Sequence, residues 1–401
     1  MNYQEKPTNF NHVSDQVAQT CISFDEGMTR LANDQRQIHD IKGPLRDWMP
    51  VVTTENRFAL RYRPTGRDYI PTPHALNHIA IKGRMSTWAV KSLTEPIYHQ
   101  TALDDDGEKR VVYRRDGRDA IVLRDYVQLH LFQSDRMDQN KMRLFRTWNN
   151  GTLRAFLSDR YAIINNLWFM QTLQQLIPGG LLVHWRGDAD EIFGNVLIPD
   201  TIRQENDSNY GGMLSISNSE IGTRKYVTCP SVFRAICMNG CILGEKAGVA
   251  IRGVHKGNIN LNDLRSRIRK NLELQIPLLP QGITRMLGLR DYDMGNTPIR
   301  PLLAQLRRDY SIGKKHISGI VKAWGTEMGI LGTVARTAFG LQAAITRYGQ
   351  TLSNTDWLRF DHIGGNFANM SRSNWINFRK RAAAMDMKTV DKLVGEITLV
   401  G

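Results

Sequence analysis

Arginines alternate with aromatic side chains between residues 143 and 161, where the chain reads RLFRTWNNGTLRAFLSDRY. A guanidinium group can contact a phosphate while a neighbouring ring stacks on a base, and proteins that bind single-stranded nucleic acid combine these two contacts. The candidates for phosphate contact are Arg143, Arg146, Arg154 and Arg160, and the candidates for stacking are Trp148 and Tyr161. An equally weighted alternative is that the rings form core and the arginines lie on a solvated surface.

A second polar cluster follows an expected strand in SISNSEIGTRKY, residues 215–226. Alternation of apolar and polar residues from Met213 onward indicates a half-buried strand, so the polar residues after it gather at one strand end. Arg224 and Lys225 in this segment are two more candidates for phosphate contact. Polar groups at such a place can also satisfy buried backbone atoms.

Three acidic residues, Asp188, Asp190 and Glu191, lie within four positions. Such a group could hold Mg²⁺ in a nuclease or another phosphoryl-transfer enzyme. The flanking sequence offers no second group of ligands, and acids are common in turns, so a turn is the favoured interpretation.

Other candidate sites are incomplete. Cys237 and Cys241 are spaced for a metal, as are His74 and His78, but neither pair has the further ligands that zinc needs. No P-loop, dinucleotide-binding fingerprint or Ser-His-Asp arrangement is present in the sequence. The sequence therefore predicts no catalytic residue, no metal and no cofactor.

Positive charge is in excess: 53 Lys and Arg against 39 Asp and Glu give a formal net charge of +14 and a pI of about 9.7. An anionic polymer is the simplest partner for such a chain, although a solvated basic surface could have the same composition. Four cysteines are too few for a disulfide scaffold in 401 residues. With neither a signal peptide nor a long apolar run in the sequence, we expect a cytoplasmic protein without membrane contact.

The elements that must position these residues follow an α+β pattern. We expect short strands over residues 49–70 and 96–132, a loop or short helix over 133–152, and a strand, a turn and a return strand over 153–164. A strand pair at 181–200 and strands near 213–219 and 225–230 follow, and SVFRAICMNG (231–240) is expected to be a helix. Further helices are expected over 73–93, 165–177 and 261–276.

Composition divides the chain into three parts. Residues 1–48 are polar and predict an N-terminal arm, and residues 49–255 predict an α+β core with a central antiparallel β-sheet and packed helices. Residues 256–401 predict a mostly helical C-terminal part.

Several short motifs carry a resemblance to a known family. The matching residues are Leu157, Ser158, Asp159, Arg160, Tyr161, Asn218, Ser219, Glu220, Gly222, Cys237, Asn239 and Gly240. This order resembles the phage and plasmid-like proteins that are grouped as a domain of unknown function, over most of residues 70–260. Short strands followed by a helix on a basic chain are more remotely similar to phage single-strand annealing proteins of the Rad52-like kind.

These observations lead to one expected function and two alternatives. We expect non-catalytic binding of single-stranded DNA, and the resemblance implies strand annealing in phage recombination or replication by a homo-oligomer in the host cytoplasm. One alternative is a metal-dependent nuclease that uses the acids near Asp190, and the other is a phage structural or protein-interaction factor.

Overall fold

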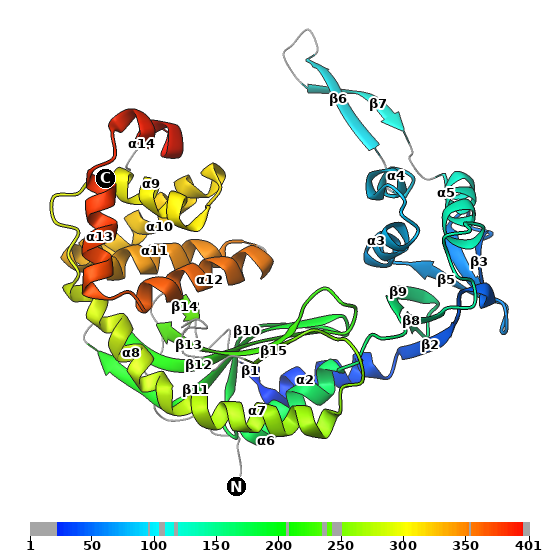
Figure 1. Ribbon diagram of the computed structural model, residues 1–401, viewed down its shortest axis with the longest axis horizontal. Helices are drawn as coiled ribbons and strands as arrows, with labels where there is room; N and C mark the ends of the chain where they lie inside the picture. The colour runs from blue at the N-terminus through cyan, green and yellow to red at the C-terminus, as the bar shows by residue number, and fades with distance from the viewer. Residues whose placement is uncertain are drawn as a thin grey trace.

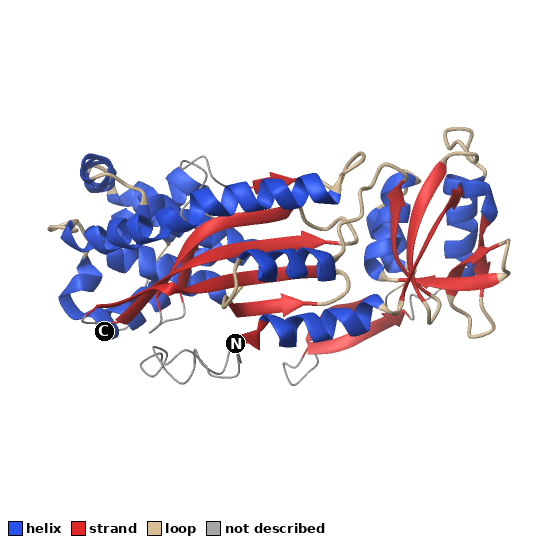
Figure 2. Cartoon of the chain, turned by 90° about the horizontal axis from the view of Figure 1, so that it is seen from below, coloured by secondary structure: helices blue, strands red, loops and turns tan. Residues whose placement is uncertain are grey.

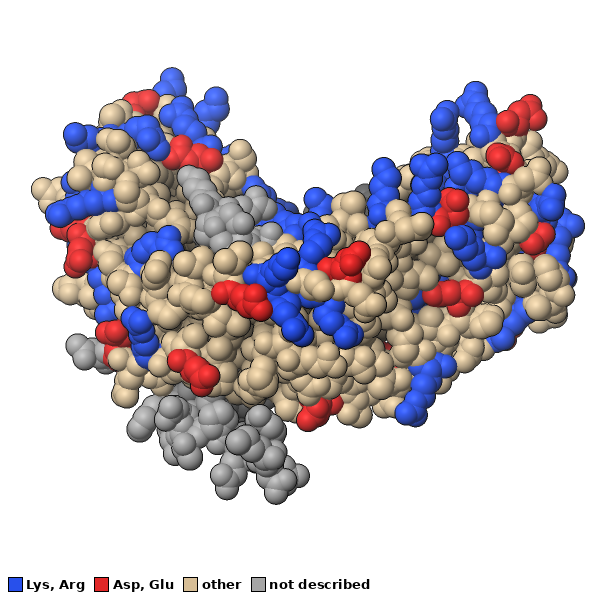
Figure 3. Space-filling model, turned by 60° about the horizontal axis from the view of Figure 1, so that its bottom comes forward, with Lys and Arg blue, Asp and Glu red and all other residues tan. Residues whose placement is uncertain are grey.

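The computed structural model describes residues 22–94, 97–103, 109–115, 119–205, 208–234, 239–242, 251–352 and 354–395. Two lobes rise from the ends of a curved base, and Figure 1 shows their arrangement. In the space-filling view of Figure 3, the surface is deeply hollowed between the two lobes. The fold is mixed α+β, as the sequence predicts, with antiparallel sheets first and a largely helical region over residues 261–394.

The first lobe contains a six-stranded sheet in the order β2-β8-β9-β5-β4-β3. Its strands are β2 (Ile38–Pro44), β3 (Trp48–Val52), β4 (Phe58–Tyr62), β5 (Arg67–Pro71), β8 (Met142–Trp148) and β9 (Thr152–Ser158), with the short helix η2 (Leu45–Asp47) before β3. All neighbouring strands are antiparallel except β5 and β9. The hairpin of β6 (Ile97–Leu103) and β7 (Lys109–Arg115) projects from this lobe (Figure 1).

Helices α3 (Pro73–Lys82), α4 (Thr87–Ser92) and α5 (Ala120–Val127), and the π-helical turn η3 (Gln128–Phe132), pack on one face of this sheet. The buried Trp48 ring stacks on Phe145 with 3.9 Å between ring centroids. Helix α3 begins where the sequence predicts, because the Thr72 hydroxyl accepts a hydrogen bond from the Ala75 backbone N–H and Pro73 occupies the first turn.

The base is a seven-stranded antiparallel sheet in the order β1-β10-β11-β12-β13-β14, with β15 also paired to β13. Its strands are β1 (Ile22–Ser23), β10 (Leu181–Gly187), β11 (Glu191–Glu205), β12 (Ser208–Ser219), β13 (Tyr226–Arg234), β14 (Asn239–Ile242) and β15 (Ile251–Gly253). Figure 2 shows helices lying across its outer face, and these are α2 (Phe24–Gln35), α6 (Asn166–Leu176) and α7 (Leu261–Gln275).

Apolar and polar side chains alternate along β12, so the two faces of the sheet have different contacts. Leu214 and Ile216 join the core under α6 and α7, so Ser215 and Ser217 lie on the opposite, concave face. Helix α7 has the predicted apolar face, since Leu264, Ile268 and Leu272 are spaced four residues apart and are buried.

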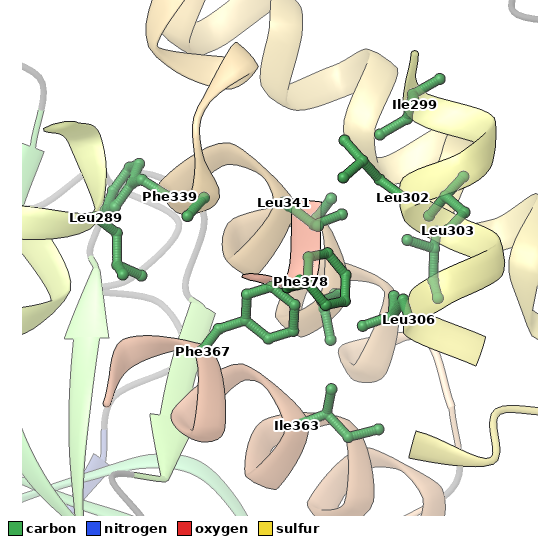
Figure 4. Packing of buried hydrophobic residues seen from close by; sticks show 14 of the residues in the cluster. Leu289, Ile299, Leu302, Leu303, Leu306, Phe339, Leu341, Ile363, Phe367 and Phe378 are labelled. Atoms are coloured by element: carbon green, nitrogen blue, oxygen red, sulfur yellow. The ribbon is translucent and has the colours of Figure 1, made fainter. Parts of the chain in front are cut away.

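The second lobe is a helical bundle. It consists of η6 (Ile276–Leu278), α8 (Leu279–Gly288), η7 (Leu289–Asp291), α9 (Ile299–Tyr310), α10 (Lys314–Leu331), η8 (Gly332–Arg336), α11 (Ala338–Gln350), α12 (Asn354–Ala368), α13 (Arg372–Ala383) and α14 (Met387–Val394). Figure 4 shows side chains of its core, in which Leu302 and Leu306 from α9 meet Phe367 from α12 and Phe378 from α13. An ion triad around the buried Glu327 connects this lobe to the base, because Glu327 contacts Arg234 of β13 at 2.9 Å and Arg347 of α11 at 2.7 Å.

Two local predictions are wrong around the motifs. No return strand follows β9: residues 161–165 lack regular structure and lead directly into α6. The Tyr161 hydroxyl instead donates to Ser219 O, and the Ala162 N–H donates to His255 O. Hydrogen bonds to distant segments therefore take the place of strand pairing with β9. The helix expected from Ser231 is also wrong, because β13 continues to Arg234.

Proline does not end β13. On one edge, β13 pairs first with β15, up to Thr228, and then with β14, from Ser231 onward. Pro230 lies between these two stretches, where no described strand pairs with that edge. A strand accepts a residue without a backbone N–H at such a position.

Other segments differ from the expectation in type. Residues 142–148 form β8 rather than a loop or short helix, and residues 120–127 form α5 rather than a strand. Residues 22–48, placed in a polar arm by composition, contribute β1, α2 and β2. Cys237 lies outside the described residues, as do residues 104–108 and 116–118 of the segment expected to form strands. Among the described helices, none is both long enough and apolar enough to cross a membrane.

Candidate nucleic-acid interface

A pocket of about 240 Å³ lies where α12 meets the concave face of the base sheet. Ser215, Ser217 and Cys229 form part of its floor, and these three side chains come from adjacent strands β12 and β13. The rim carries the cationic residues Arg224, Lys225 and Arg252. Strand pairing therefore brings together cations from the turn after β12 and from β15.

Each cation is positioned by a different contact. The Arg224 Nε atom lies 2.9 Å from Glu191 Oε2, and the Arg224 guanidinium carbon lies 5.6 Å from the centroid of the Phe193 ring. Lys225 is exposed, and its backbone carbonyl accepts a hydrogen bond from the Ser217 hydroxyl at 3.2 Å. The rim thus presents one partly neutralised guanidinium beside an exposed ammonium group.

Arg252 meets the helical lobe at the pocket. One of its guanidinium nitrogens lies 3.0 Å from His362 Nε2 on α12. Because a guanidinium group can only donate, His362 Nε2 accepts this hydrogen bond and the ring is neutral in this arrangement. His362 and Leu358 of α12 therefore close one side of the pocket. The rest of the lining combines the side chains of Ile216, Val227 and Cys229 with hydroxyl and cationic groups that can bind an anion.

A separate buried network joins the base sheet to the first lobe. Arg146 of β8 lies 3.0 Å from Glu220 Oε2 and 3.0 Å from Asp40 Oδ1. Arg154 of β9 lies 2.7 Å from Asp190 Oδ1 and 3.7 Å from Glu220 Oε2. The side chains of Arg146, Arg154 and Glu220 are at most 1% exposed. We call these five residues the inter-sheet joint.

Charge pairing dominates the electrostatics of the joint. Burial alone would lower the pKa of Arg146, but the charges of Glu220 and Asp40 outweigh burial and raise the pKa. Arg146 also donates to the Glu220 backbone carbonyl at 2.6 Å. The joint is therefore a set of charged groups that depend on one another for compensation inside the protein.

The motif residues surround this joint. The Glu220 carboxylate accepts a hydrogen bond from the Asn166 N–H at 2.7 Å, and Asn218 Nδ2 donates to Ile164 O at 2.8 Å. The Tyr161 ring stacks on His255 at 5.0 Å between centroids. Burial raises the pKa of Tyr161 and lowers that of His255, which favours the neutral form of both rings.

The predicted phosphate contacts separate into two groups. Arg224 and Lys225 line the pocket and Arg160 is exposed, as a contact with solvent-borne anions requires. Arg146 and Arg154, by contrast, are fully buried in the joint, and Arg143 is 7% exposed. Arg146 and Arg154 do not face a groove, because the turn after β12 covers their face of the sheet. Arg143 lies on the other face with Phe145, and its guanidinium carbon is 5.9 Å from the centroid of the Phe156 ring.

The two stacking candidates are also engaged within the protein. The Arg154 guanidinium carbon lies 5.3 Å from the centroid of the Trp148 ring, and Trp148 is half-buried. Tyr161 is held by its hydrogen bond to Ser219 O at 2.7 Å. Both rings therefore stabilise the joint in this arrangement.

The acidic cluster is divided among separate partners. Asp188 Oδ1 accepts from the N–H groups of Asp190 and Glu191, Asp190 pairs with Arg154, and Glu191 pairs with Arg224. Within the described residues, no group of three or more His, Cys, Asp or Glu side chains is arranged to hold a metal.

Arg252 and His362 are pocket residues that the sequence analysis missed. Arg252 lies twelve residues after Gly240, the last of the motif residues, and α12 is reached only after most of the helical lobe. Arg252 follows Ile251 in a short apolar stretch, a pattern that indicates a strand with one cation pointing outward. No local sequence pattern distinguishes His362.

The fold and pocket define a mixed α+β protein with a cationic pocket on the concave face of an antiparallel sheet. The chain belongs to the family described as a domain of unknown function (DUF932), whose family model matches residues 155–355. The matched segment begins in β9 and ends in α12, so it includes Glu220 of the joint and most of the pocket. No curated protein and no solved structure matches the chain.

Proposed function

We propose that the protein binds single-stranded DNA without cutting it and promotes annealing of complementary strands in phage recombination or replication. The observation that carries the proposal is the gathering of Arg224, Lys225 and Arg252 around one pocket on the concave face. Figure 3 adds that Lys and Arg side chains lie on both lobes and at the near edge of the hollow between them. A strand in this hollow would lie beside positive charge along its path.

The pocket offers groups that can bind a phosphate, beside the apolar side chains of Ile216, Val227 and Leu358. Its floor carries the hydroxyl groups of Ser215 and Ser217, and its rim offers ammonium and guanidinium donors. Phosphate oxygens accept charge-assisted hydrogen bonds from such groups, and each phosphate neutralised releases counterions from the strand. Binding through these contacts is independent of base sequence, as annealing of arbitrary complementary strands requires.

Annealing requires two strands to be presented together. The remote similarity to phage annealing proteins supports a homo-oligomer in which copies side by side hold an extended strand, in the cytoplasm of an infected bacterium. A non-catalytic role is supported by the acids near Asp190, each of which already has an arginine or backbone partner.

The proposal is tested by measuring binding and annealing of labelled complementary oligonucleotides over a salt series, with and without Mg²⁺. We expect affinity that falls steeply with salt, faster annealing and intact strands. Strands that are cut only when Mg²⁺ is present would favour a nuclease. Failure to bind at low salt would overturn the proposal and leave a protein partner as the better explanation.

A further inference from the structure

The most exposed large aromatic side chain among the described residues is Trp88, at 74%. It lies on α4, which begins with Ser86 capping the Ala89 N–H at 3.2 Å. The other side of this helix is anchored by Val90, which is 1% exposed. Exposing an indole forgoes a large apolar contribution to folding, so this ring is available for a ligand.

Basic side chains accompany this ring. Lys82 ends α3, Arg84 lies in the link between the helices, and Lys91 is three residues after Trp88 on α4; all three are exposed. Residues three apart on a helix are neighbours, so the Lys91 ammonium group is within reach of the indole. The whole segment from Tyr69 to Thr94 contains no Asp or Glu.

The nearest acids on the adjoining helix α5 have local partners. Asp119, whose N–H donates to Leu93 O, caps α5 by accepting from the Val122 N–H at 2.9 Å. Asp125 pairs with Arg124 at 2.7 Å. Among the described residues, the surface around α4 therefore carries more positive than negative charge, next to an exposed ring.

The position of α4 connects this surface to the proposed function. Figure 1 shows α3 and α4 on the side of the first lobe that faces the helical lobe across the open space, with α5 on the opposite side. The space-filling view confirms that the surface between the lobes is hollowed. A strand bound at the pocket could extend along the hollow to this surface.

We propose that Trp88 stacks on a base of the bound single strand, with Lys82, Arg84 and Lys91 beside its phosphates. This inference rests on the proposed function and adds a base-stacking site to it. A ring that stacks on any base would hold a strand without reading its sequence. The ring also fixes a base in an unpaired position, from which it can meet a complementary strand.

The test is a thermodynamic cycle on the full-length protein. Fluorescence anisotropy would measure binding of a labelled oligothymidine, and of the same strand with several bases removed to leave abasic sugars. Trp88→Ala should raise the Kd for the intact strand about 5- to 100-fold, but should change the Kd for the abasic strand much less. Trp88→Phe should keep most of the affinity, because a phenyl ring can still stack.

Two further variants separate stacking from charge. Trp88→Ala should leave the salt dependence of binding unchanged, whereas Lys91→Ala should reduce the slope of log K against log salt by about 0.7. Leu274→Ala is the matched control, since Leu274 is 63% exposed on α7, on the outer face of the base. Thermal unfolding would verify that each variant is folded.

Three outcomes would overturn the inference. If the wild type binds, and Trp88→Ala binds the intact strand and the abasic strand each as tightly as the wild type does, the ring is not a stacking site, although the proposed function survives. If Trp88→Ala alters the oligomeric state in light scattering and leaves DNA affinity unchanged, the ring is a contact between copies. If the wild type does not bind single strands at low salt, the proposed function and this inference both fail.

Discussion

Glu220 and Arg146 form a buried ion pair, 3.0 Å apart, between the base sheet and the first lobe. The carboxylate side chain is 1% exposed and the guanidinium side chain is fully buried. Because Arg146 comes from β8 and Glu220 follows β12, the pair connects segments that are remote in sequence. Without its partner, either charge would be buried and uncompensated, which would destabilise the folded protein.

Replacing Glu220 by Gln should therefore destabilise the protein strongly. The change leaves two buried guanidinium groups with less negative charge, and loss of one partner from a buried pair typically costs about 3–5 kcal/mol. Urea unfolding would measure this loss. The matched control is Glu26→Gln, because the Glu26–Arg30 pair at 2.9 Å is solvent-exposed and should matter little. Equal effects of the two substitutions would contradict a structural role for the joint.

Removing cations from the pocket should weaken DNA binding in a salt-dependent way. Lys225→Ala and Arg252→Ala should each lower the slope of log K against log salt by about 0.7, because each would remove one of the proposed phosphate contacts. Binding titrations at several salt concentrations would measure the slopes. Lys388→Ala combined with Lys392→Ala on α14 is the control, since both lysines are exposed on the helical lobe away from the pocket. An equal fall in slope for the control would show that only net charge matters.

Stability should decrease below neutral pH partly through His78. Burial, followed by the charges of His74 and Lys82, lowers the pKa of His78 from 6.5 to about 4. Between these two values the unfolded chain binds a proton and the folded chain does not, so the contribution of His78 is complete above pH 6.5 and is lost as pH falls toward 4.

The comparison of wild type with His78→Gln isolates this effect from other titrating groups. The wild type should lose about 1–2 kcal/mol more than the variant when pH is lowered from 7 to 5, by the energy that one pKa unit represents. Chemical denaturation at both pH values would measure the difference. A difference of zero would mean that His78 takes up its proton in the folded state as readily as in the unfolded state.

Two glycines of the helical lobe should respond oppositely to alanine. A Cβ atom on Gly340 would lie 2.1 Å from the backbone carbonyl oxygen of Ala335, so Gly340→Ala must displace backbone and should destabilise by about 1–3 kcal/mol. A Cβ atom on Gly325 would meet open space on the exposed side of α10, and Gly325→Ala should stabilise by about 0.5–1 kcal/mol. Thermal unfolding would measure both changes, and a stable Gly340→Ala variant would refute the close approach of η8 and α11.

Local sequence information was sufficient for elements whose pattern and packing agree. Helix α7 shows its apolar stripe in sequence, and α3 shows its cap and its proline, so both could be predicted. Strand β8 could not, because Arg143 and Arg146 interrupt its apolar pattern and suggest a solvated segment. The burial of Arg146 depends on Asp40 and Glu220, which lie far away in the sequence.

The site was predictable only in part for the same reason. Arg224 and Lys225 follow the end of a strand whose pattern is readable, and they do line the pocket. Arg154 has the same residue type and similar aromatic neighbours, yet it is buried beside Asp190. Residue type and spacing do not reveal which face of a sheet a second sheet will cover. Only the tertiary structure distinguishes a cation that meets solvent from one that meets a buried carboxylate.

The pairing of β1 with β10 has a consequence for synthesis on the ribosome. Ile22 pairs with Leu182, and α2 packs against α6, so the whole first lobe is inserted between two halves of one sheet-and-helix layer. At 5–20 residues per second, the ribosome would need roughly 8–30 s after synthesising β1 to synthesise its partner strand β10. During that interval the first lobe can complete its own sheet, whereas the apolar side of α2, with Phe24 and Leu31, stays exposed to solvent. Nascent chains halted before β10 should therefore be the form of this protein that chaperones recognise.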